Sequence, residues 1–98
     1  MSSTLNEHNA AHLADLFAAM SDPTRLRIIS VLIQKEMSVG EIAAKIDLSQ
    51  SAVSHQLRGL RQMRLIRPRK KGRQVFYCLD DDHVERLYRL GLDHVEHG

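Results

Sequence analysis

Hydrophobic residues recur at helical spacing along the first third of the chain. Leu13, Leu16, Phe17 and Met20 follow the i, i+3, i+4, i+7 pattern. This pattern is typical of one face of an amphipathic helix. The spacing predicts a first helix over about residues 5–20.

A second helix is predicted directly after the first. Asp22 and Pro23 combine a capping carboxylate with a proline suited to the first turn, and this pair marks a helix start. The buried stripe of this helix is expected to consist of Leu26, Ile29, Leu32 and Ile33.

Two short helices follow, over about residues 39–46 and 50–63, with a tight turn between them. Ser49 is the predicted N-cap of the later helix, because its hydroxyl can accept a hydrogen bond from a free first-turn N–H. The apolar seam of this helix contains Val53, Leu57 and Leu60, with Arg64 on the same face. Its opposite face is polar, with Ser51, His55, Arg58 and Gln62, and with Gln50 and Ser54 beside them.

The pattern then changes to that of a β-hairpin. Two β-rich runs, residues 65–69 and 74–79, flank a turn that contains Gly72. Pro68 lacks an N–H and therefore places its strand at a sheet edge. The run Asp80, Asp81 and Asp82 offers capping carboxylates for a last helix over about residues 81–96.

The order of these elements predicts a winged helix-turn-helix, a mainly α fold with a small β-hairpin. We expect residues 1–98 to form one domain, because 98 residues suit a single compact unit. The helix-turn-helix would span about residues 39–63 and the wing about 65–79. A chain this short buries only a thin core, so dimerisation would be a natural way to bury more.

Charge is concentrated in one segment, although the formal net charge is only +2. No acidic residue lies between Asp47 and Asp80, while eight of the fourteen lysines and arginines do. Such a block is typical of a protein that binds a phosphate backbone. On charge alone, a solvated surface is the alternative. The eight are Arg58, Arg61, Arg64, Arg67, Arg69, Lys70, Lys71 and Arg73.

Polar residues at the start of the predicted helix 50–63 suit base recognition. The second helix of such a pair can enter a major groove with its N-terminal side chains at base edges. Glutamine can bond adenine bidentately, and basic wing residues can follow the backbone or enter the minor groove. The predicted DNA contacts are Gln50, Ser51, Ser54, His55, Arg58, Arg69, Lys70, Lys71 and Arg73.

Other features limit the class of protein. No apolar run approaches the roughly 20 residues of a membrane span, and residues 1–7 lack the basic start and apolar stretch of a secretory signal. A single cysteine, Cys78, cannot form an internal disulfide. We therefore expect a cytoplasmic protein without membrane association.

Three segments, residues 22–28, 48–57 and 72–77, resemble the ArsR/SmtB family of metal-responsive bacterial repressors. The similarity covers nearly the whole chain in the family's order. It implies a homodimer, paired through the first and last helices, on an inverted repeat in double-stranded operator DNA. It also implies that effector binding weakens DNA affinity. The family's cysteine site at the third helix is missing, since residues 36–43 contain no thiol, and Cys78 is interpreted as a small strand residue.

The last predicted helix matches the family's zinc-sensing branch, with Asp81-x-His83 and His94-x-x-His97. Independently, His83 and His94 are eleven positions apart, close to three helical turns, so both lie on one face. They are separated by roughly 16 Å along the axis, too far for one ion with ligands about 2.0–2.2 Å away. An antiparallel partner helix would bring both pairs together and form two equivalent intersubunit sites.

Such a nitrogen and oxygen set suits zinc, with cobalt or nickel as alternatives. Asp80 or Asp82 could replace Asp81 as the carboxylate ligand. His8 and His12, spaced i, i+4, could also chelate. The alternative is that all of these are ordinary exposed histidines.

The sequence thus predicts a repressor that binds operator DNA without metal and is released by zinc. A repressor of the same family with a different effector, or with none, is the alternative. An enzyme is not expected, because a catalytic zinc site needs an open coordination position and a general base. The chain shows no such constellation.

Overall fold

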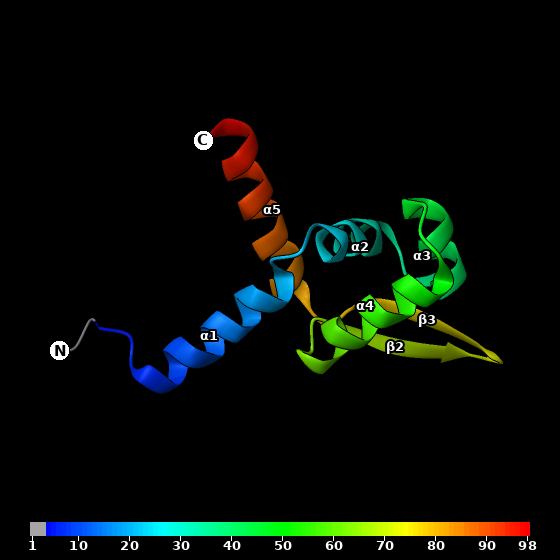
Figure 1. Ribbon diagram of the computed structural model, residues 1–98, viewed down its shortest axis with the longest axis horizontal. Helices are drawn as coiled ribbons and strands as arrows, with labels where there is room; N and C mark the ends of the chain where they lie inside the picture. Colours follow the sequence, from blue (N-terminus) through cyan, green and yellow to red (C-terminus); the bar gives the residue numbers. More distant parts are fainter. Residues whose placement is uncertain (1–3) are drawn as a thin grey trace.

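The computed structural model describes residues 4–98 and has the predicted element order (Figure 1). The elements are α1 (Glu7–Met20), α2 (Pro23–Gln34), β1 (Met37–Ser38), α3 (Val39–Ile46), α4 (Gln50–Gln62), β2 (Ile66–Lys71), β3 (Gln74–Leu79) and α5 (Asp82–His97). The winged helix-turn-helix is thereby confirmed. The first helix begins two residues later than predicted, because the Asn6 side chain accepts from the Asn9 backbone N–H and caps it.

Side chains cap α2 and α4 at the residues where the sequence predicted that these helices begin. Asp22 Oδ2 accepts from the Arg25 backbone N–H at 3.0 Å, with Pro23 in the first turn of α2. Ser49 Oγ accepts from the Ala52 N–H at 3.1 Å and begins α4. These caps satisfy first-turn N–H groups that have no partner within the helix.

The sheet has the strand order β1-β3-β2. β2 is therefore an edge strand, as Pro68 predicted. β1 was not predicted; its two residues pair with Phe76 and Tyr77 of β3. In the hairpin, Arg67, Arg69 and Lys71 lie opposite alternate residues of β3. Because strand side chains alternate between faces, all three lie on the same face of the sheet.

The core forms where α2, α3 and α4 meet the start of the hairpin. Ile28, Ile29, Ile42, Val53 and Leu60 are each 0% exposed. No charged or polar residue is buried in the part of the chain that the structure describes. The apolar seam predicted for α4 is confirmed by Val53, Leu57 and Leu60.

The placement of Arg64 on the α4 seam was wrong. The helix ends at Gln62, and Arg64 adopts a left-handed conformation with φ 58°. The backbone N–H of Leu65 then donates to the Leu60 carbonyl at 3.0 Å. This turn carries Leu65, only 2% exposed, into the core in place of Arg64.

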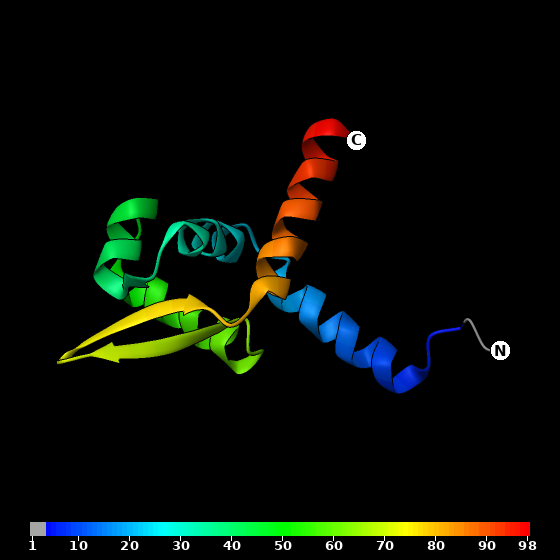
Figure 2. The same cartoon turned by 180° about the vertical axis from the view of Figure 1, so that it is seen from behind.

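α1 and α5 project from this core in different directions (Figures 1 and 2). Of the predicted α1 stripe only Met20 is buried, while Leu13 and Phe17 are 40% and 49% exposed. On α5, Leu90 and Val95 are 70% and 80% exposed. The two helices therefore carry apolar side chains that the described residues leave between 40% and 80% exposed.

None of the helices among residues 4–98 combines the length and the apolar character that crossing a membrane requires.

Candidate nucleic-acid interface and metal-binding helix

The polar face of α4 is open to solvent. α3 ends in the left-handed residue Asp47, with φ 59°, and this turn leads into the Ser49 cap of α4. All of the α4 residues predicted to touch DNA are exposed. By the helical period Ser51, His55 and Arg58 lie opposite the buried seam, and Gln50 and Ser54 lie beside it.

Gln50 also lies against the first turn of α3. A Cβ atom added to Gly40 would lie 3.5 Å from Gln50 Nε2. This distance is an ordinary van der Waals contact, so the Gln50 amide packs beside the α3 backbone. The amide lies where the two helices of the motif approach each other.

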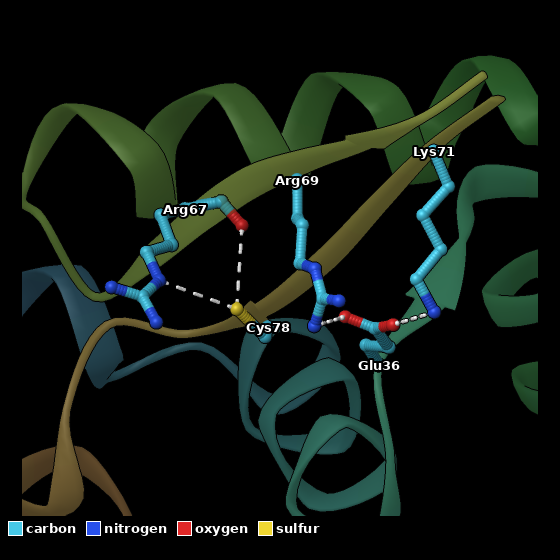
Figure 3. A network of polar contacts seen from close by, with 5 residues as sticks. All are labelled: Glu36, Arg67, Arg69, Lys71 and Cys78. Atoms are coloured by element: carbon cyan, nitrogen blue, oxygen red, sulfur yellow. Dashed lines mark hydrogen bonds and ion pairs between the residues drawn. The ribbon is translucent and has the colours of Figure 1, made fainter. Parts of the chain in front are cut away.

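Glu36, in the loop before β1, contacts two of the predicted DNA-binding residues of the wing (Figure 3). Its Oε1 lies 2.7 Å from Lys71 Nζ, and its Oε2 lies 3.3 Å from Arg69 Nη1. The hydrogen bond from Lys71, assisted by the charges of Arg69 and Lys71, lowers the pKa of Glu36. Lys71 Nζ also lies 5.4 Å from the centre of the Phe76 ring.

The other wing cations differ in their surroundings. Lys70 and Arg73 have no carboxylate within 4.0 Å among residues 4–98. The Arg67 Nε donates to Cys78 Sγ at 3.4 Å, a contact that raises the pKa of Arg67 (Figure 3). Two of the four predicted wing contacts are thus paired inside the chain and two are available to a phosphate.

A small cavity of about 190 Å³ lies between α4 and β3. It is lined by Ser54, Leu57, Arg58, Arg61 and Tyr77. Both arginines are exposed, and neither has an ion-pair partner in the described chain. Sequence reasoning placed Arg61 in the basic segment without a contact and did not select Tyr77. Two guanidinium groups beside a cavity of this size suit an oxyanion such as a backbone phosphate.

Arg25 of α2 joins three helices and was also missed. Its Nε donates to Gln56 Oε1 of α4 at 2.9 Å, and its Nη1 donates to the Ala19 carbonyl of α1 at 3.1 Å. The guanidinium lies where a Cβ on Gly59 would be. These partners are 31 and 6 positions away in sequence, so no local pattern indicates them.

The predicted metal ligands are divided between the two ends of α5. Asp81 caps the helix: its Oδ1 accepts from the His83 backbone N–H at 2.8 Å and lies 3.2 Å from His83 Nδ1. The contact with the His83 ring lowers the pKa of Asp81. At the far end, His97 Nδ1 lies 3.0 Å from Asp93 Oδ1, a partner that the sequence did not suggest.

One subunit does not bring the four predicted ligands together. Within residues 4–98 no three His, Cys, Asp or Glu side chains are close enough to hold a metal ion. Asp81, His83, His94 and His97 are all exposed. The rings of His8 and His12 lie 4.4 Å apart, edge to face, on α1.

Comparison with known proteins identifies close relatives. Residues 22–67 match the family model described as "bacterial regulatory protein, arsR family". The "transcriptional repressor SmtB homolog" of Synechocystis is 48% identical over 87 residues, which are 89% of this chain and 66% of the relative. The chain thus spans just under two thirds of that protein's length. The "HTH-type transcriptional regulator NmtR" of Mycobacterium tuberculosis is 38% identical over 98% of this chain and 80% of its own.

Solved structures agree with these matches. Reduced HlyU from Vibrio cholerae superimposes with a TM-score of 0.81 at 37% identity, covering 94% of this chain and 96% of that one. NolR from Sinorhizobium fredii gives a TM-score of 0.82 at 32% identity, with 96% of both chains covered.

Proposed function

Because the chain belongs to the arsR family of bacterial regulatory proteins, we propose that it is a dimeric transcriptional repressor that responds to zinc. Membership of this family makes the chain a transcription regulator, as expected, and not an enzyme. The sign of its effect is part of the proposal, since relatives include a protein named as a repressor and one named as the transcriptional activator HlyU.

The DNA-binding part of the proposal rests on α4 and the wing. Each subunit would place the exposed start of α4 in a major groove, with Gln50, Ser51, Ser54 and His55 at base edges. Arg58 and the unpaired wing residues Lys70 and Arg73 would contact phosphates. Arg69 and Lys71 remain candidates, although Glu36 holds both. We propose that the whole chain acts as one winged-helix domain, in the cytoplasm, on an inverted-repeat operator.

The dimer part rests on the uncovered apolar side chains of the projecting helices. Leu13 and Phe17 of α1 and Leu90 and Val95 of α5 are between 40% and 80% exposed. An apolar surface of this kind on a short chain marks a contact with another protein. A second copy, related by a two-fold axis, would present the same side chains and cover them.

The observation that carries the metal part is the division of candidate ligands between the ends of one exposed helix. Asp81 and His83 lie at its start, His94 and His97 at its end. An antiparallel partner α5 would place each pair beside the other pair of its neighbour. The nitrogen and oxygen donors suit zinc, with cobalt or nickel as alternatives. Bound zinc would link the two α5 helices, favouring the dimer form with low DNA affinity.

His94→Ala tests this site. The variant should remain a folded dimer with unchanged DNA affinity in the absence of metal, and zinc should no longer release it from the DNA upstream of its own gene. Coupling between two such sites is typically about 1–3 kcal/mol, a 5–150-fold change in affinity. Fluorescence anisotropy with a zinc titration measures it.

His12→Ala is the matched control, because it removes a histidine from the other candidate pair. It should respond to zinc like the wild type. If zinc releases His94→Ala from DNA at the same concentration as the wild type, the α5 site is excluded. A wild-type protein that binds this DNA but ignores zinc would favour a regulator with another effector.

A further inference from the structure

We propose that Glu36 is an internal competitor of DNA: it holds Arg69 and Lys71 in the free protein and so lowers the affinity of the wing for DNA of any sequence. This inference rests on the proposed DNA-binding function.

The geometry of the contact resembles that of a phosphate group between two cations. Each carboxylate oxygen of Glu36 takes a different partner, Lys71 Nζ at 2.7 Å and Arg69 Nη1 at 3.3 Å (Figure 3). A DNA phosphate also presents two oxygens, which could bind the same lysine and arginine. Glu36 therefore occupies the position that a bound phosphate would take on this face of the wing.

Glu36 is held in place, while its partners are freer. Its side chain is 21% exposed, against 59% for Arg69 and 51% for Lys71. The next residue, Met37, is 3% exposed and pairs with Tyr77 in the sheet. The hydrogen bond from Lys71 also lowers the pKa of Glu36 and keeps the carboxylate ionised. The carboxylate is thus the less exposed partner, and the two more exposed cations have room to turn away from it toward a ligand in solvent.

The exchange is feasible because exposed ion pairs are weak and are screened by salt. DNA phosphates could displace Glu36, but each phosphate that binds Arg69 or Lys71 would have to break an ion pair already present. Such a phosphate contact adds less affinity than one made by a free cation. Lys70 and Arg73, which have no carboxylate within 4.0 Å in the described chain, carry no such cost.

Glu36→Gln tests the proposal on the intact chain with a labelled duplex of mixed sequence, so no operator is needed. Each phosphate neutralised adds about 0.9 to the slope of log K against log salt concentration. With two cations released, the slope should steepen by between about 1 and 2 units. Affinity near 0.1 M salt should rise several-fold, up to on the order of tenfold per cation.

Glu85→Gln is the matched control. It removes one negative charge and one ion pair, that of Glu85 with Arg89 at 2.7 Å, on the projecting helix α5. Equal changes in the two variants would show an effect of net charge alone and overturn the proposal. Weaker binding by Glu36→Gln would also overturn it, because the pairs would then position the wing for DNA.

A double-mutant cycle with Lys71→Gln gives a second readout. Lys71→Gln should change the salt slope little when Glu36 is present and flatten it by about 0.9 when Glu36 is replaced. An equal effect in both backgrounds would contradict the competition. If neither the wild type nor any variant binds DNA at low salt, the proposed function is overturned as well. If all of them bind DNA with the same salt slope, only this inference is overturned.

Discussion

Replacing Arg25 by alanine should destabilise the chain much more than replacing any exposed arginine. The side chain is half-buried and donates two hydrogen bonds, to Gln56 Oε1 at 2.9 Å and to the Ala19 carbonyl at 3.1 Å. Both bonds join α2 to another helix. In Arg25→Ala both acceptors lose their donor, and a gap opens beside Gly59.

The magnitude follows from these two bonds. A hydrogen bond to a charged group is worth about 1.5–3 kcal/mol. One side chain makes both bonds, and water can reach part of the site, so we expect a total loss of about 2–3 kcal/mol in the free energy of unfolding. For a domain of this size about 1 kcal/mol lowers the melting temperature by about 4–8 °C. The expected shift is therefore about 10–20 °C.

Arg27→Ala is the control on the same helix. Arg27 is exposed, and its side chain makes no hydrogen bond or ion pair within residues 4–98. Its replacement should change stability by no more than about 0.5 kcal/mol. Urea unfolding of both variants at one protein concentration measures the difference, because a dimer's stability depends on concentration. Equal stabilities would refute the role given to Arg25.

Other predictions concern DNA and metal. Arg73→Ala should flatten the slope of log K against log salt concentration for DNA binding by about one unit. Lys71→Ala should flatten it less, because Glu36 already holds that lysine. Equal flattening in the two variants would contradict this distinction. Gln50→Ala or His55→Ala should reduce the preference for operator over mixed-sequence DNA by about 1–3 kcal/mol in competition assays. Cys78→Ser should leave release by zinc unchanged in a titration, because Cys78 is the only cysteine of the sequence and is not among the proposed ligands.

The fold could be predicted because its signals are local. Asp22 before Pro23, and Ser49 before α4, each act through a cap that spans three positions. The apolar seam of α4 repeats at helical spacing. Arg64 fits that spacing, but the helix ends before it, and periodicity alone does not show where a backbone turns left-handed. β1 was missed because two residues are too few to form a pattern.

The candidate site was less predictable because its side chains meet across the fold. Exposure of the polar α4 face follows from the helical period and could be anticipated. The contact of Glu36 with Arg69 joins residues 33 positions apart and depends on the sheet register. The pairing of Asp93 with His97 is local, at i, i+4. The charged residues of α5 allow several pairs at this spacing, and the sequence does not show which of them form. Charge counting therefore overstated the number of free cations on the wing.

The regulator divides into a part that the family match covers and a part that it does not. The match spans residues 22–67, from the cap of α2 into the first wing strand, and so includes α4 but not the proposed phosphate contacts of the wing. α5 and its N-cap Asp81, which together carry all four proposed ligands, lie outside it. α5 packs mainly against α2 and β3, and α2 in turn holds α4 through the bond from Arg25 to Gln56. A change in the packing of the two α5 helices of the proposed dimer would therefore reach α4 most directly through α2. Substitutions in α2 are thus expected to include variants that bind both zinc and DNA but in which zinc no longer lowers DNA affinity.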